Sequence, residues 1–286
     1  MDFNAIKFEK LDLNGLKTLV DWAKTEGWNP GPNDAEVFWA TDPDGYFGYF
    51  LNGEMIGGGS VVSYKGDFGF MGFFIVKPAY RSLGIGRKLW YQRRDYLLSR
   101  LKPGASIGMD GVVAMQPFYK KGGFELAFRD ERHMKKGELF AVNPNISSIE
   151  KDDFDAVLAF DKMCFGFARP QFLEPWLHMP GNKQFKYVSE GKLQGFAIMR
   201  KAASGYKICP LFATDAAIAE ALYQACLNAA PGEEVFLDIP VTNPAAVNLI
   251  KKHNTTYVFE CARMYYGKQP EVALNMIFGI TTFELG

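Results

Sequence analysis

Apolar and polar residues repeat with helical and strand-like periods over the first 135 residues. A helix is predicted over residues 12–25, because apolar side chains recur on one face at Leu13, Leu16, Leu19, Val20 and Ala23. Apolar runs over 47–51, 55–64 and 68–76 predict strands, and Asn52-Gly53 predicts a hairpin turn between the first two. We expect further strands over 4–8, 105–109 and 124–133, and further helices over 35–39, 89–101 and 117–121.

The second half repeats this order of elements. Its pattern predicts strands over 185–190, 193–201, 206–211, 234–239 and 257–266, and helices over 215–229, 244–253 and from Ser148 or Asp152 toward Met163. Charged residues, Gly137 and Pro144 interrupt the pattern over 135–147, which favours two domains, 1–138 and 139–286. Each domain is expected to be α/β (α+β), with a mixed, mostly antiparallel sheet flanked by helices.

The stretch Arg81-Ser-Leu-Gly-Ile-Gly86 joins the strand over 68–76 to the following helix. Gly84 and Gly86 have no side chains, so the backbone can approach a bound group closely and direct its amides toward it. The start of a helix adds unpaired N–H groups and a positive dipole end, and Arg81 and Arg87 add charge. This combination predicts a pyrophosphate-binding loop; an ordinary glycine-rich turn is the alternative.

Other phosphate-binding loops have a different spacing. A Walker loop has four residues between its glycines and then Gly-Lys-Ser or Gly-Lys-Thr, and a dinucleotide-binding loop has a third glycine where this chain has Leu89. The sequence therefore fits neither class. Basic residues continue along the predicted helix at Arg93 and Arg94, where they are either ligands or part of a solvated face.

The strand over 68–76, the loop Arg81-Ser-Leu-Gly-Ile-Gly86 and the helix after it resemble the acetyl-CoA-binding motif of the GCN5-related N-acetyltransferases (GNAT). The segment Gln116-Pro-Phe-Tyr-Lys-Lys-Gly-Gly-Phe124 is similar to the closing helix and strand of that family. Nearly the full chain is similar to tandem acetyltransferases of the YitH/HolE-like kind. The resemblance implies two tandem GNAT-like domains. The first is expected to be catalytic and the second degenerate, because no Arg-x-x-Gly-x-Gly follows Leu211.

The resemblance also implies where acetyl-CoA binds. Backbone groups of the strand end would contact pantetheine, at Phe74, Ile75 and Val76. The loop and helix start would hold the phosphates through Arg81, Ser82, Leu83, Gly84, Ile85, Gly86, Arg87 and Lys88. Ser82 stands where the family usually has glycine. Tyr119 matches the family's general acid and would protonate the departing thiolate.

The implied reaction transfers an acetyl or other short acyl group from CoA to a small-molecule primary amine. A base must accept the amine proton, and residues 70–76 contain no carboxylate. Asp110 is our preferred base, with Glu26 and Asp34 as alternatives, although Asp110-Gly111 is also a favoured turn dipeptide. Loops that overhang a rigid scaffold often carry specificity, which suggests Trp28, Asn29 and Gln116 as substrate-binding residues. The alternative function is a non-catalytic acetyl-CoA-binding sensor or scaffold.

The composition of the chain mainly argues against certain classes of partner and site. The chain has 286 residues, 48% hydrophobic and 22% charged, and a formal net charge of zero, which gives no indication of nucleic acid or an anionic membrane as a partner. No secretory signal or apolar run of membrane length is present, so we expect a cytoplasmic protein, a monomer whose two domains pack as a pseudo-dimer. No metal site is predicted, and free buried thiols are expected at Cys164, Cys209, Cys226 and Cys261.

Overall fold

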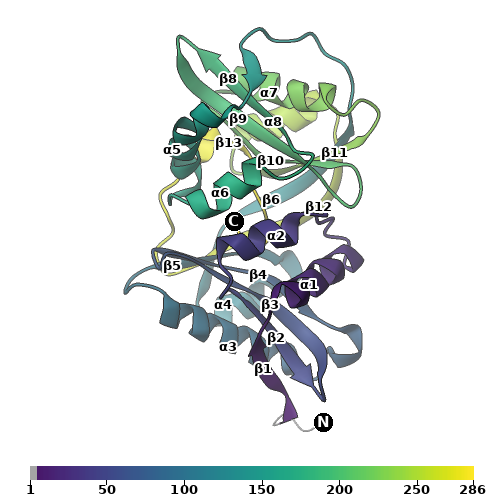
Figure 1. Ribbon diagram of the computed structural model, residues 1–286, viewed down its shortest axis with the longest axis vertical. Helices are drawn as coiled ribbons and strands as arrows, with labels where there is room; N and C mark the ends of the chain where they lie inside the picture. The colour runs from purple at the N-terminus through teal and green to yellow at the C-terminus, as the bar shows by residue number, and fades with distance from the viewer. Residues whose placement is uncertain (1–4) are drawn as a thin grey trace.

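The computed structural model describes residues 5–286, which form two lobes joined through one continuous sheet (Figure 1). The first half contains the helices α1 (Leu13–Thr25), α2 (Asp34–Thr41), α3 (Ile85–Arg100) and α4 (Gln116–Lys121). Its strands are β1 (Lys7–Lys10), β2 (Tyr46–Leu51), β3 (Glu54–Tyr64), β4 (Phe68–Val76), β5 (Ser106–Val112) and β6 (Phe124–Lys136). Short 3-10 helices cover Pro78–Tyr80 and Val113–Met115.

The second half follows the same order of elements. Its helices are α5 (Phe154–Phe165), α6 (Pro170–Leu177), α7 (Ala216–Asn228) and α8 (Pro244–Lys252), with 3-10 helices over Lys151–Asp153 and Leu274–Met276. Its strands are β7 (Ile146–Ser148), β8 (Lys183–Ser189), β9 (Lys192–Lys201), β10 (Tyr206–Ala213), β11 (Glu234–Pro240), β12 (Thr256–Tyr266) and β13 (Ile277–Gly279). The repeated order confirms the mixed α/β fold expected from the sequence.

Most predicted elements lie within a few residues of the observed ones. The hairpin at Asn52-Gly53 is confirmed, with positive φ at both residues. The first predicted strand begins one residue inside the undescribed part of the chain, and its described part lies at β1. α6, β7 and β13 were not predicted. No helix within residues 5–286 combines the length and the apolar character that crossing a membrane requires.

The two halves exchange their closing strands. β6 pairs with β11 and β12 pairs with β5, and β6 and β12 also pair with each other at the centre of the sheet. The strand order is β1-β2-β3-β4-β5-β12-β6-β11-β10-β9-β8-β7, with β13 beside β10. Each half therefore completes its sheet with a strand from the other half. The sequence pattern had indicated two domains that follow one another along the chain, and it contained no sign of this exchange.

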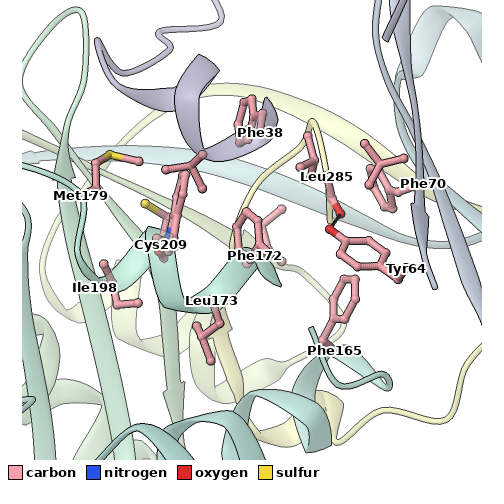
Figure 2. Packing of buried hydrophobic residues seen from close by; sticks show 14 of the residues in the cluster. Phe38, Tyr64, Phe70, Phe165, Phe172, Leu173, Met179, Ile198, Cys209 and Leu285 are labelled. Atoms are coloured by element: carbon pink, nitrogen blue, oxygen red, sulfur yellow. Dashed lines mark hydrogen bonds between the residues drawn. The ribbon is translucent and has the colours of Figure 1, made fainter. Parts of the chain in front are cut away.

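A shared apolar core fills the space between the lobes (Figure 2). Phe38 on α2 packs against Trp176 on α6, with ring centroids 6.1 Å apart. The segment 280–286 runs through this core, where Leu285 is fully buried and its carbonyl accepts a hydrogen bond of 2.8 Å from the Tyr64 hydroxyl. The two halves therefore share buried surface as well as strands. The four cysteines are free and buried, as predicted.

Candidate active site

A cleft opens between β4 and β5 because their pairing stops halfway. The parallel ladder extends from Phe68 and Ser106 to Met71 and Met109 and goes no further. Beyond it, β4 contains a bulge, since two residues of β4 face one residue of β3 and Phe73 has a φ of 49°. The two strands therefore splay apart, and the backbone of β4 from Phe73 to Val76 borders the opening.

Arg93 on α3 stabilises this bulge from behind. Its guanidinium is buried and donates hydrogen bonds to the carbonyls of Ser60 and Gly72, the latter at 2.7 Å. Burial lowers the pKa of Arg93 to about 9. A β-carbon at Gly59 would overlap the guanidinium, so glycine is required there. Arg93 therefore belongs neither to a solvated face nor to a ligand-binding surface, the two alternatives that the sequence left open.

The predicted anion-binding loop lies at the mouth of the same cleft. Gly84 is the N-cap of α3 with a φ of 80°, and Ser82 also has a positive φ of 63°. The first helical hydrogen bond is donated by Lys88 to Gly84, so the amides of Ile85, Gly86 and Arg87 precede any acceptor within the helix. A β-carbon on Gly86 would meet only Phe74 at 3.5 Å and Val76 at 3.8 Å. The protein's own packing does not require glycine at position 86, and the open space suits an external group.

The charged residues of the loop differ in their surroundings. Arg81 donates to the Val76 carbonyl at 2.8 Å and forms an ion pair with Glu26, which fixes the loop against the end of α1. Arg87 and Lys88 are exposed, and Leu83 is also on the surface. The loop therefore combines backbone amides at the start of α3 with two cationic side chains at the protein surface, a combination that favours an anion.

A cavity of about 760 Å³ extends from this loop into the interior. The first half contributes residues from β4, β5, α4 and the loop after α1, among them Trp28, Phe74 and Tyr119. The second half contributes Phe259, Cys261, Phe283 and Glu284. The site is consequently composite, because the exchanged strand β12 and the segment 280–286 close the side of the cavity that faces the second lobe.

Tyr119 lines the cavity and is 4% exposed. Its ring stacks on Trp90, with centroids 5.9 Å apart, and packs so closely on β5 that a β-carbon at Gly111 would overlap it. Burial raises the pKa of Tyr119 to about 12, opposed by the nearby Arg93. The phenol is therefore held in one place and stays protonated at neutral pH.

Asp110 also borders the cavity, within β5 rather than in a turn. Its two carboxylate oxygens accept hydrogen bonds of 2.6 and 2.7 Å from Arg263 on β12. Burial raises the pKa of Asp110, and the Arg263 guanidinium opposes that shift. The turn interpretation of Asp110-Gly111 is wrong, because the exchanged strand β12 extends the pairing of β5 through both residues.

The other candidate residues are dispersed. Trp28 and Glu26 line the cavity, whereas Asp34 is buried in an ion pair of 2.9 Å with Arg200. Asn29 exchanges side-chain hydrogen bonds with the backbone of Ser204, at 2.9 and 2.7 Å, and so joins the two lobes. Gln116 begins α4 and is not among the cavity-lining residues in the described part of the chain.

Sequence reasoning missed the contribution of the second half to this cavity. Phe259 and Cys261 reach it through strand exchange, and Phe283 and Glu284 reach it through the segment after β13. None of these residues belongs to a motif. The pairing of β12 with β5, which no local pattern encodes, brings them to the cleft.

Known proteins match both halves. An acetyltransferase (GNAT) family model matches residues 13–124, and an acetyltransferase (GNAT) domain model matches residues 157–279. A holothin acyltransferase from Pseudoalteromonas sp. is 30% identical over 276 residues, which cover 96% of this chain and 92% of the relative. Among solved structures, one from Pyrococcus horikoshii superposes with a TM-score of 0.84 at 23% identity, over 100% of this chain and 98% of the other. A tandem GNAT protein from the clavulanic acid biosynthesis pathway superposes with a TM-score of 0.66 at 13% identity, over 93% and 99% of the two chains.

The composite cleft and these matches define an acyltransferase, an enzyme built from two GNAT domains in one chain. The chain belongs to the GNAT acetyltransferase family. Enzymes of this family take their acyl group from a coenzyme A thioester, and the cleft between β4 and β5 has the free amides and the open space that such a donor requires.

Proposed function

We propose that the protein is an acetyl-CoA-dependent N-acetyltransferase that acts on a small-molecule primary amine. One observation carries this proposal: a single cavity connects the free amides at the start of α3 with Tyr119 and with a pocket closed by the second half. The domain assignment is part of the proposal: residues 1–138 form the catalytic GNAT domain with the donor loop and Tyr119, and residues 139–286 form a degenerate GNAT-like unit without a pyrophosphate loop, which adds side chains to the same cavity.

The residues of the loop and of β4 fit the donor. The loop over Ser82–Lys88 would hold the pyrophosphate, chiefly through the amides of Ile85, Gly86 and Arg87, which have no acceptor within the helix, with Arg81 orienting the loop. The bulged backbone over Phe74–Val76 has no ladder partner on β5 and would contact the pantetheine arm. When bound, the donor supplies an acyl carbon activated by its bond to sulfur.

Tyr119 is proposed as the general acid. It is the phenol that borders the cavity next to β5, and its raised pKa keeps the proton in place until a thiolate accepts it. Direct contact is needed for this transfer, because a free thiol has a pKa near 8.5 and the phenol a higher one. Asp110 is the base that the sequence favours. Both of its carboxylate oxygens accept hydrogen bonds from Arg263, which makes them less available to an amine.

The second half supports a small acceptor. Phe259 and Phe283 close the cavity, so an acceptor must fit within the enclosed space and cannot extend as a protein segment through that side. The aromatic lining, which includes Trp28 and Phe73, favours an apolar or aromatic amine. The relative named as a holothin acyltransferase supports a small-molecule acceptor.

The second half is not proposed to bind CoA. Its counterpart of the cleft, between β10 and β11, is filled by β13, which pairs with Leu211 and Phe212. Its counterpart of the loop starts α7 at Asp215, whose side chain accepts from the amide of Ile218 at 2.9 Å. In the second half, β13 thus occupies the backbone groups of β10, and the Asp215 side chain occupies an amide at the start of α7, so these groups are not available to a cofactor.

Calorimetry with acetyl-CoA and a thiol-release assay on a panel of primary amines test the proposal. We expect acetyl-CoA to bind and free CoA to appear with at least one aromatic or alkyl amine. Binding without product over the whole panel would support a sensor instead. Absence of binding would remove the donor assignment altogether.

A further inference from the structure

The segment after β13 carries a carboxylate into the active-site cavity. We propose that Glu284 accepts the proton of the acceptor amine; this inference rests on the acetyltransferase function proposed above. Glu284 lines the cavity together with Tyr119 and Asp110, although 165 residues separate Glu284 from Tyr119 in the chain. Its residue is 5% exposed, so the carboxylate lies inside the protein.

The backbone on both sides of Glu284 is held in place. The Leu285 carbonyl accepts a hydrogen bond from Tyr64 at 2.8 Å, and the Leu285 amide donates to the Thr282 hydroxyl at 2.8 Å. Arg169, itself fully buried, donates at 2.7 Å to a backbone oxygen of Gly286. Leu285 belongs to the same buried apolar cluster as Phe38, Phe70 and Tyr64 (Figure 2). The backbone around Glu284 is therefore held in place by neighbours that are not among the cavity-lining residues.

Glu284 lies directly against the strand that borders the acyl site. Its backbone oxygen is so close to β4 that a β-carbon on Gly72 would overlap it, and the Ser60 hydroxyl approaches it at 3.4 Å. Gly72 immediately precedes Phe73, where the bulge begins. Glu284 thus lies next to the part of β4 where an acceptor amine would meet a thioester held by the bulged backbone.

Charged groups from several elements surround this carboxylate. Arg132, Arg200 and Lys207 interact with it as cations, and Asp34 and Asp110 interact with it as carboxylates. The cavity also contains Glu26, Arg81, Tyr119 and Cys261, and Arg263 lies behind Asp110. Burial lowers the pKa of Lys207 to about 8, and that ammonium group donates to the Trp28 carbonyl at 2.9 Å.

The competing carboxylates are already engaged. Asp110 uses both oxygens for Arg263, Glu26 is paired with Arg81 at the loop, and Asp34 is held by Arg200 and the amide of Gly31. Glu284 is the cavity-lining carboxylate in residues 5–286 that forms no ion pair within 4.0 Å, which leaves its oxygens available to an amine. We therefore assign Asp110 a positioning role and Glu284 the proton transfer.

An alkyl ammonium ion first loses one proton to a carboxylate oxygen of Glu284, which passes it through water to the solvent. The neutral nitrogen then forms a bond to the acyl carbon as the carbon–sulfur bond breaks, and the sulfur gains one proton from Tyr119. The second proton of the nitrogen passes through water to the Tyr119 phenolate. The products are an amide, free CoA and one proton released to solvent.

The experiment compares Glu284→Gln and Glu284→Asp with wild type from pH 6 to pH 10. The assay follows thiol release with the best acceptor from a panel of benzylamine, phenethylamine and tryptamine. We expect Glu284→Gln to lower kcat/KM about 100-fold at pH 7, within the usual range for loss of a general base. The loss should fall below about tenfold at pH 10, because an alkyl amine with a pKa near 10 is then deprotonated by solvent. Glu284→Asp should keep the wild-type pH profile at a reduced kcat.

Controls separate this role from folding and from the donor. Glu271→Gln makes the same change at an exposed residue that precedes β13 and lies outside the cavity, and it should match wild type. Acetyl-CoA affinity and the unfolding temperature of Glu284→Asp should also stay close to wild type. A loss in Glu284→Gln that is equal at every pH, or no loss, overturns the assignment. Wild type that binds acetyl-CoA but acetylates no amine overturns the proposed function itself.

Discussion

Asp110 and Asp238 occupy equivalent positions in the two halves, each as the fifth residue of its strand, in β5 (Ser106–Val112) and β11 (Glu234–Pro240). Each carboxylate binds an arginine through both oxygens, Asp110 with Arg263 at 2.6 and 2.7 Å and Asp238 with Arg132 at 2.6 and 2.6 Å. In both cases the arginine belongs to the exchanged strand. The same ion pair occurs where the cleft is open and where β13 fills it, so its shared role is to hold the exchanged strands.

Arg263→Met and Arg132→Met should therefore destabilise the fold to a similar extent. Each substitution leaves a buried carboxylate without its cation, which typically costs about 3–5 kcal/mol. Urea unfolding at pH 7 measures the loss. Arg129→Met, on the same strand as Arg132 but in a half-exposed pair with Glu260, should cost about 0–1 kcal/mol. Equal losses of unfolding free energy in Arg132→Met and Arg129→Met would show that the buried ion pairs do not stabilise the exchanged strands.

The loop and cleft proposed to hold the donor could be predicted from the sequence because they are formed by consecutive residues. Strand, loop and helix start occupy consecutive residues, and the glycine spacing in Arg81-Ser-Leu-Gly-Ile-Gly86 reflects backbone geometry that neighbours along the chain determine. Trp28 lines the cavity, and it remains a proposed substrate-binding residue for a related reason, because it lies in the loop directly after α1. Asn29, its neighbour, instead binds Ser204 of the other lobe, a contact that no local pattern indicates.

The acceptor side could not be predicted because it depends on long-range pairing. The partner of Asp110 is 153 residues away, and Glu284 is brought to β4 by the exchange and by the path of the segment after β13. Gly72 is an example of a residue whose role depends on such a long-range contact. Its sequence context is an apolar strand, and only the structure shows that the glycine leaves room for the backbone of Glu284.

Acetyl-CoA should bind with a stoichiometry of one per chain. The cleft between β10 and β11 contains β13, whose continuation donates from Ile280 to the carbonyl of Asp238 at 2.8 Å. Entry of a pantetheine arm there would require that strand to leave its ladder. Isothermal titration of the full chain gives the number directly. Two sites of comparable affinity would contradict the assignment of the second half as degenerate.

Gly86→Ala should change stability and donor affinity in opposite directions. Gly86 is in the first turn of α3, where alanine is favoured over glycine by up to about 1 kcal/mol, and the new methyl meets only ordinary contacts with Phe74 and Val76. The same methyl would occupy the space next to a bound pyrophosphate, so we expect acetyl-CoA affinity to fall at least tenfold. Thermal unfolding and calorimetry measure the two effects. Unchanged affinity would mean that the donor lies elsewhere.

Gly72→Ala should impair acyl transfer more than donor binding. The added β-carbon overlaps the backbone oxygen of Glu284 and would displace the segment, while the loop at α3 stays in place. We expect kcat/KM to fall by about one to two orders of magnitude, the range for a misplaced general base, with acetyl-CoA affinity within threefold of wild type. Ser60→Ala removes only the 3.4 Å contact to the same oxygen and should have a small effect. An active Gly72→Ala enzyme would argue against any role of Glu284 in proton transfer.

Tyr119→Phe should lower kcat without weakening acetyl-CoA binding, because the ring and its packing on Trp90 and Gly111 remain while the transferable proton is lost. The pH dependence of the Tyr119 contribution follows from the direction in which its pKa is shifted. The acid must be protonated to act, and burial raises its pKa to about 12, so activity that depends on Tyr119 is present below that pH and is lost only above it. The wild-type profile of kcat should consequently show no falling limb from this group between pH 6 and pH 10. A decline centred near pH 8 that Tyr119→Phe abolishes would mean that the phenol is not in the buried environment seen beside Arg93.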